Sequence, residues 1–106
     1  MSVPEITPDE LASRIGGVVL VDVRQPDEYE AAHVRSAHLI PLDTLPDRIG
    51  EVPTDQVVFV MCRSGGRSAV ASEFLLGHGI SAVNLVGGIL AWVEAGHEGV
   101  TGAQPE

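Results

Sequence analysis

Cysteine and lysine are scarce in this chain, and it has no long hydrophobic run. One cysteine and no lysine occur among 106 residues, and six arginines stand against fifteen acidic residues for a formal net charge of −9. A lone cysteine excludes an intramolecular disulfide and fits a reducing compartment. The acidic balance argues against nucleic-acid binding, which needs a basic surface. Without an apolar run of membrane-spanning length or a signal peptide, we expect a cytoplasmic protein with no membrane partner.

The chain also lacks the patterns that mark metal sites and phosphate loops. Its four histidines do not show ligand spacing, and one cysteine cannot build a structural zinc site, so we expect no metal and no cofactor. The absence of lysine excludes a Gly-Lys-Ser/Thr phosphate loop. We expect His33 to form structural hydrogen bonds rather than to act in catalysis.

The length and composition fit a single domain over residues 1–106. A chain of this size leaves no room for two domains, and an apolar content of 44% is enough for a packed core. No linker or internal repeat divides the sequence. The polar tail from about residue 98, which contains glycine and proline, is expected to fray.

Segments typical of strands and of helices alternate along the chain. Residues 18–23 and 56–61 are nearly continuous β-branched and apolar runs, which are typical of strands covered on both faces. A capping box from Thr7 to Glu10 begins the first helix. Shorter strands are expected near the N-terminus and at 37–41 and 82–86, and helical segments at 8–15, from 26, 43–49, 68–76 and 89–94. This alternation predicts an α/β fold with a mostly parallel sheet of about five short strands and helices on both faces.

Cys62 stands where the second strong strand ends in a glycine-rich turn. Ligands of an open parallel sheet bind beyond the carboxyl ends of its strands, which is where this strand places the thiol. The glycines allow a tight curl with inward-pointing N–H groups, and the helix that begins near Ser68 adds its positive end. These groups favour the thiolate, the nucleophilic form of cysteine, and would hold an anionic substrate. The predicted site has Cys62 as nucleophile and Arg63, Ser64, Gly65, Gly66, Arg67 and Ser68 as binding residues.

The residues of this turn also allow a structural interpretation. A lone cysteine is often a buried, inert residue, but the Arg-Ser-Gly-Gly-Arg run directly after Cys62 disfavours that interpretation. No acid lies between Asp55 and Glu73. We therefore expect Arg63 and Arg67 to bind an anion rather than to pair with neighbouring carboxylates.

Asp22, Arg24 and Trp92 are candidates for supporting roles. Asp22 and Arg24 end the first strong strand and could tune the electrostatic field around Cys62. We favour the alternative that Arg24 pairs with Glu28 and that Asp22 braces a loop. Trp92 could wall the ligand crevice or serve as the buried residue of an amphipathic helix, and the sequence favours neither.

Three segments resemble the signatures of the single-domain rhodaneses, a family of sulfurtransferases. They are residues 22–34, with Asp-Val-Arg followed by Glu-Tyr and a histidine; residues 62–68; and residues 87–96, with Gly-Gly followed by Trp and Gly. The resemblance spans roughly residues 4–100 in the family's order. Departures from the family's usual residues occur outside the cysteine loop, at Ala32, Ser36, His38 and His97.

The resemblance implies a three-layer rhodanese-like fold and a ping-pong sulfur transfer. The Cys62 thiolate would attack the outer sulfur of thiosulfate or another sulfane donor, leaving a persulfide on Cys62 and releasing sulfite. Cyanide, a thiol or a protein would then accept the sulfur. The amides from Arg63 to Ser68 would stabilise the persulfide anion, and Arg67 and Arg63 would bind the donor's oxygens, with loop length favouring Arg67.

Alternative functions remain open at this stage. A persulfide carrier for sulfur relay, or a sulfide sensor, would act through the same cysteine with a protein partner. A phosphatase of the same architecture would need a longer loop than the four residues between Cys62 and Arg67, and an arsenate reductase would need a second, resolving cysteine. A non-catalytic scaffold is disfavoured because the cysteine and both arginines are retained.

Overall fold

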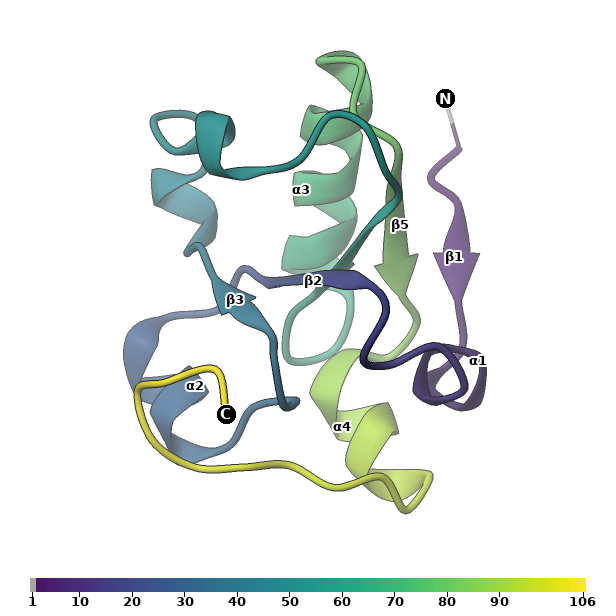
Figure 1. Ribbon diagram of the computed structural model, residues 1–106, viewed down its shortest axis with the longest axis vertical. Helices are drawn as coiled ribbons and strands as arrows, with labels where there is room; N and C mark the ends of the chain where they lie inside the picture. Colours follow the sequence, from purple (N-terminus) through teal and green to yellow (C-terminus); the bar gives the residue numbers. More distant parts are fainter. Residues whose placement is uncertain (1) are drawn as a thin grey trace.

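A parallel β-sheet of five strands forms the centre of the fold (Figure 1). The computed structural model describes residues 2–106, and its strands stand in the order β1-β5-β4-β2-β3 with parallel neighbours throughout. The strands are β1 (Glu5–Ile6), β2 (Val19–Asp22), β3 (His38–Leu39), β4 (Val58–Met61) and β5 (Ala82–Leu85). The predicted α/β fold is confirmed, and the carboxyl ends of the strands all point to one side of the molecule.

Short helices connect the strands. They are α1 (Pro8–Ala12), α2 (Pro26–Ala31), α3 (Gly66–Gly77) and α4 (Gly88–Glu94), with the 3₁₀ helices η1 (Leu42–Thr44) and η2 (Ile49–Glu51). The predicted capping box begins α1, because Thr7 Oγ1 accepts a hydrogen bond from the Glu10 amide at 3.2 Å and Glu10 Oε1 accepts one from the Thr7 amide at 3.1 Å. Helix α1 ends earlier than the predicted residue 15, and residues 13–16 continue as turns.

The side chains of β4 divide the core into two layers. Val58 and Val60 pack on the face that α3 covers, whereas Phe59 and Met61 pack on the face that α1, α2 and α4 cover. Figure 1 shows α3 above β2 and β3, with α2 and α4 below them. All four β4 residues are buried, which explains the continuous apolar run that predicted this strand.

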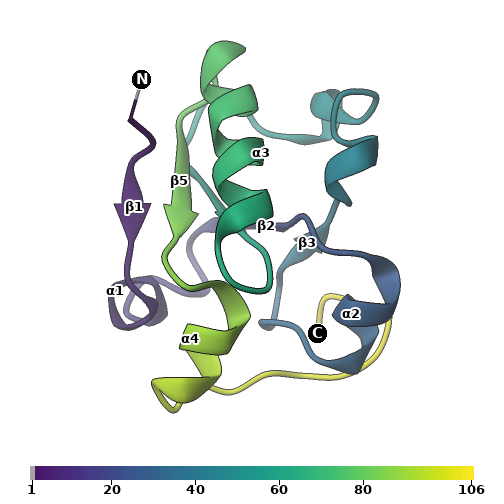
Figure 2. The same cartoon turned by 180° about the vertical axis from the view of Figure 1, so that it is seen from behind.

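The C-terminal tail is held against the loop that follows α2. The amide of Val100 donates to the His33 carbonyl at 2.7 Å, and the His33 amide donates to the Val100 carbonyl at 2.8 Å. A further bond joins the Gly102 amide to the Glu30 carbonyl at 2.9 Å. Figures 1 and 2 both show this segment, in yellow, passing beside α2. The tail thus departs from the expected frayed end, because the exposed backbone edge after α2 gives it hydrogen-bond partners.

Among residues 2–106, none of the helices has both the length and the apolar character needed to cross a lipid bilayer.

Candidate active site

Cys62 directly follows strand β4 and is the first residue of the loop that leads into α3. The side chain is 1% exposed and belongs to the buried cluster on the α3 face. Gly65 adopts φ +108° and acts as the N-cap of α3. L-residues with a side chain rarely adopt this conformation, so Gly65 allows the loop to curl back over the cysteine. The expectation that α3 begins near Ser68 is corrected to Gly66.

Hydrogen-bond donors of the loop converge on the Cys62 sulfur. The Gly65 amide donates to Sγ at 3.1 Å, and the Ser68 hydroxyl donates to it at 3.3 Å. Burial raises the pKa of the Cys62 thiol, but the Ser68 hydroxyl and the amides of Ser68, Gly65 and Ser64 outweigh it, so the pKa lies below its ordinary value. The N-terminal end of the twelve-residue α3 adds partial positive charge on the same side. The loop therefore favours a thiolate at Cys62.

Arg67 forms an ion pair that local sequence did not reveal. Its Nη1 and Nη2 donate to Glu28 Oε1 and Oε2 at 2.7 and 2.8 Å, in a bidentate arrangement. This hydrogen bonding lowers the pKa of Glu28 to about 2. The expectation that the loop arginines lack a carboxylate partner is therefore wrong for Arg67, because the fold brings Glu28 of α2 to the loop from 39 positions upstream.

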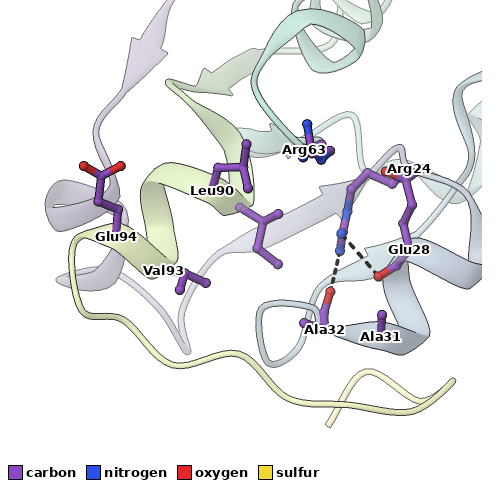
Figure 3. Close-up of a pocket in the computed structure, with 9 residues that line it drawn as sticks. Arg24, Glu28, Ala31, Ala32, Arg63, Leu90, Val93 and Glu94 are labelled. Atoms are coloured by element: carbon purple, nitrogen blue, oxygen red, sulfur yellow. Dashed lines mark hydrogen bonds between the residues drawn. The ribbon is translucent and has the colours of Figure 1, made fainter.

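Arg63 is exposed and has a different environment. Within residues 2–106, its side chain makes no hydrogen bond or ion pair, unlike those of Arg24 and Arg67. It lies at the end of a pocket of about 500 Å³ between α2 and α4 (Figure 3). Of the two loop arginines, Arg63 has the guanidinium that a ligand can reach without displacing a carboxylate.

Asp22 and Arg24 form a buried ion pair beside the loop. Arg24 Nη2 donates to Asp22 Oδ2 at 2.8 Å, and the side chains are 5% and 0% exposed. Arg24 Nε also donates to Asp22 Oδ1 and Oδ2, at 3.0 and 3.1 Å. The other guanidinium bonds go to the carbonyls of Glu28 and Ala32, at 3.3 and 2.7 Å. The favoured pairing of Arg24 with the Glu28 carboxylate is therefore wrong. Asp22 does brace the loop after β2, because its Oδ1 also accepts the Arg24 amide at 3.0 Å.

Trp92 belongs to the core rather than to the pocket beside the cysteine loop. Its side chain is 4% exposed and packs in the cluster formed by α1, α2 and α4. The indole Nε1 donates to the Glu98 carbonyl at 3.0 Å. Of the two roles considered for Trp92, the structure shows the buried one.

The structure adds two residues that sequence reasoning did not assign to the site. Asn84 of β5 is buried, and its Nδ2 donates to the Gly65 carbonyl at 3.3 Å. Gly88, with φ +60°, lies so close to the backbone of Cys62 and Arg63 that a Cβ would collide with both. In the sequence, the Gly-Gly pair at 87–88 was the available sign of a close backbone approach. The fold shows that Gly88 approaches the backbone of Cys62 and Arg63.

The first turn of α4 is joined directly to the cysteine loop. The Ile89 amide donates to the Cys62 carbonyl at 2.9 Å, and the Leu90 amide donates to the Arg63 carbonyl at 3.2 Å. The site therefore consists of one loop fixed by β5 and α4, with α2 supplying the partner of Arg67. No group of three or more histidine, cysteine, aspartate or glutamate side chains within residues 2–106 is arranged to hold a metal ion.

Residues 7–95 match the rhodanese-like domain family. The chain belongs to the rhodanese family. A sulfurtransferase of Allochromatium vinosum is 39% identical over 98 residues, which are 89% of this chain and 92% of that protein. A rhodanese-related protein from Thermoplasma volcanium has a TM-score of 0.90 at 31% identity, covering 93% of this chain and 99% of its own. A rhodanese-like domain protein from Staphylococcus aureus has a TM-score of 0.81 at 38% identity, covering 85% and 91%.

The family match confirms the resemblance to rhodaneses that was inferred from the three sequence segments. It also supports sulfurtransferase activity in general, and with it a sulfur donor and a sulfur acceptor as reaction partners. In this rhodanese, the residues matched to the family contain β4, the cysteine loop and the first turn of α4.

Proposed function

We propose that this rhodanese transfers sulfane sulfur through a persulfide on Cys62. The observation that supports this proposal is the set of donors around Sγ, with the Gly65 amide at 3.1 Å and the Ser68 hydroxyl at 3.3 Å. Such donors stabilise a sulfur anion, first as the thiolate and then as the persulfide. The lowered pKa of the Cys62 thiol makes the reactive form available without a separate general base.

Thiosulfate is the donor that we propose for the first step. The Cys62 thiolate attacks the outer sulfur, a new sulfur–sulfur bond forms, and the bond between the two sulfurs of thiosulfate breaks. Sulfite leaves with the electron pair, and the persulfide retains one negative charge. A thiophilic acceptor (cyanide, a thiol or a protein) then attacks the outer persulfide sulfur and regenerates the thiolate.

Arg63 is the residue that we propose to bind the donor's charged oxygens. The sequence favoured Arg67 for this role, but the Arg67 guanidinium is already bonded at both nitrogens to Glu28. Arg63 stands next to the nucleophile in the chain and has an exposed side chain. A free guanidinium there provides charge-assisted hydrogen bonds to sulfonate oxygens.

Burial of the nucleophile restricts the chemistry that the loop allows. Because Cys62 is only 1% exposed, the sulfur is shielded from bulk water, and a narrow terminal sulfur atom reaches it more easily than a phosphoryl group with three oxygens. This favours sulfur transfer over the phosphatase alternative. A free thiol of this kind also fits the reducing cytoplasm that we propose as the protein's location.

Mass spectrometry of the intact protein tests this proposal. Exposure to thiosulfate should add one sulfur atom to the wild-type chain, and cyanide or a reducing agent should remove it. The Cys62→Ser variant should gain no sulfur and should not turn over thiosulfate. Equal turnover by that variant would contradict the proposed mechanism.

A further inference from the structure

A second pocket, of about 370 Å³, is lined by the end of α1, the loop after α2 and the start of the C-terminal tail. We call it the tail pocket, and its lining residues lie within the ranges 12–16, 34–36 and 92–98. None of the residues from Cys62 to Ser68 lines it, so it is separate from the cysteine loop. Its volume lies in the range of sites that bind small organic molecules.

One wall of the tail pocket is apolar. Ala12, Ile15, Val34 and Trp92 contribute to it. Val34 and Trp92 are 1% and 4% exposed, so they form a fixed, buried base, whereas Ile15 is 39% exposed and leaves apolar surface in contact with water. A ligand that covers Ile15 would gain free energy from burying that surface.

Two opposite charges without protein partners border this apolar wall. Arg35 and Glu98 both line the tail pocket. Among residues 2–106, neither side chain forms an ion pair, with the other or with a third residue. His97 differs from them, because its Nε2 is already bonded to Asp9 Oδ1 at 2.7 Å. The pocket therefore offers one guanidinium and one carboxylate to a ligand.

Backbone and indole hydrogen bonds hold the walls of the tail pocket in place. The Trp92 Nε1 donates to the Glu98 carbonyl at 3.0 Å, and the His97 amide donates to the Trp92 carbonyl at 3.1 Å. The paired bonds between His33 and Val100 fasten the tail to the loop that carries Arg35. Figures 1 and 2 show the tail leaving the end of α4 and running towards α2. A pocket that is already formed binds a ligand with little ordering cost.

We infer that the tail pocket binds a free α-amino acid with an apolar side chain. The carboxylate of the amino acid lies at Arg35, its ammonium group lies at Glu98, and its side chain covers Ile15. Charge complementarity selects this class, because an apolar anion would place no cation at Glu98 and an apolar amine would place no anion at Arg35. The inference goes beyond sulfur transfer and does not depend on the chemistry of Cys62.

A titration with three related probes tests the inference. They are L-phenylalanine, 3-phenylpropionate, which lacks the ammonium group, and phenethylamine, which lacks the carboxylate. In NMR spectra of the ¹⁵N-labelled protein, L-phenylalanine should cause saturable shifts of the Trp92 indole N–H and of the Arg35 and Glu98 amides. Its affinity should exceed that of each analogue roughly tenfold, because each analogue loses one charge-assisted contact.

Two charge-removing variants assign the contacts. Arg35→Gln should abolish the preference for L-phenylalanine over phenethylamine, and Glu98→Gln should abolish the preference for L-phenylalanine over 3-phenylpropionate. Arg14→Gln and Glu73→Gln are the controls, because both residues are exposed and neither lines the tail pocket. Both preferences should be unchanged in the controls. Since each result is a ratio of affinities within one variant, a modest loss of stability does not produce it.

Three outcomes would overturn the inference. The first is the absence of saturable shifts with L-phenylalanine up to its limit of solubility. The second is equal affinity for all three probes, which would mean that neither charge takes part in binding. The third is a set of shifts confined to the amides of residues 62–68, which would place the ligand at the cysteine loop. None of these outcomes bears on sulfur loading of Cys62, so the proposed function is tested separately.

Discussion

At the scale of single residues, the state of Cys62 depends on a small number of donors. The sulfur is removed from bulk water, and this alone would favour the neutral thiol. The Ser68 hydroxyl and the loop amides reverse that preference. Because each donor acts on a buried anion, a single deletion has a measurable effect on the thiolate.

Replacing Ser68 by alanine should raise the pKa of the Cys62 thiol. The change removes the hydroxyl that lies 3.3 Å from Sγ, and a hydrogen bond to a charged group contributes about 1.5–3 kcal/mol. The rate of alkylation at a pH below the thiol pKa should therefore fall by about tenfold or more. The pH dependence of iodoacetamide labelling measures the effect.

Ser72→Ala supplies the matched control for that experiment. Ser72 lies on the same helix and is equally buried, but its hydroxyl has no hydrogen-bond partner among the described residues. Its removal should leave the labelling profile unchanged and should not lower stability. An identical labelling profile for Ser68→Ala and the wild type would show that the hydroxyl does not stabilise the thiolate.

At the scale of elements, the pair between Glu28 and Arg67 ties α2 to the start of α3. Glu28 has a pKa of about 2 in the folded protein, against an ordinary value of 4.5. A depressed carboxylate pKa contributes stability that is complete above pH 4.5 and is lost as the pH falls towards 2. The side chains of Arg67 and Glu28 are 36% and 26% exposed, respectively, so solvent screening limits the contribution to about 1 kcal/mol.

Glu28→Gln should remove this pH-dependent contribution. The free energy of unfolding by urea should be lower than that of the wild type by up to about 1 kcal/mol above pH 4.5. The difference should vanish below pH 2, where the wild-type carboxylate is also mostly protonated. A difference that stayed constant across this range would mean that the effect does not come from the charge of Glu28.

The first turn of α4 controls the position of the cysteine loop. Gly88→Ala would place a methyl group against the backbone of Cys62 and Arg63, at a positive φ that alanine rarely adopts. We expect a loss of stability of about 1–3 kcal/mol and slower persulfide formation. Thermal unfolding and thiosulfate turnover measure the two effects.

Gly77→Ala is the control for the variant at position 88. Gly77 lies in the last turn of α3, and a Cβ there would meet no atom within 4 Å. That change should be neutral or slightly stabilising, because alanine is the better helix former. Normal turnover by Gly88→Ala would show that the loop tolerates displacement by α4.

Elements were the most predictable part of this protein. The buried runs around β2 and β4, the capping box of Thr7 and the glycines at helix ends carry local signals, and most observed elements lie within the predicted segments. Predicted lengths were less accurate, as for α1 and for the start of α3. The ends of short helices depend on tertiary contacts such as that between Asn84 and Gly65, which no local pattern encodes.

At the scale of the whole molecule, sheet topology explains why three distant segments form one site. Strand β4 lies between β5 and β2. The cysteine loop follows β4, the start of α4 follows β5, and the turn with Arg24 follows Asp22 at the end of β2. Since the strands are parallel, all three segments emerge on the same side of the sheet.

Long-range pairings were beyond sequence reasoning for the same reason. Arg67 and Glu28 are 39 residues apart, and their pairing depends on which helices the sheet order places side by side. Because the Glu28 carboxylate is bonded to Arg67, the nearby Arg24 pairs with Asp22 instead. The position of Cys62 in a loop of hydrogen-bond donors could be predicted, whereas the partners of the loop arginines and the pocket between α2 and α4 could not.

Deletion of residues 99–106 should destabilise the whole fold. It removes the two hydrogen bonds between Val100 and His33, the bond from the Gly102 amide to the Glu30 carbonyl and the bond from the Ser36 amide to the Pro105 carbonyl. With about 0.5–1.5 kcal/mol for each bond, the free energy of unfolding should fall by about 2–6 kcal/mol in urea titrations. Val100→Ala keeps the backbone pairing and should retain most of the stability, and an unchanged midpoint for the deletion would show that the tail contributes nothing.

Trp92 is an intrinsic fluorescence probe of this protein. It is the only tryptophan in the chain, it is 4% exposed, and it precedes Val93 on α4. Its emission spectrum should therefore shift to the red when the fold is lost. A urea titration followed by fluorescence would give the free energy of unfolding without an added label.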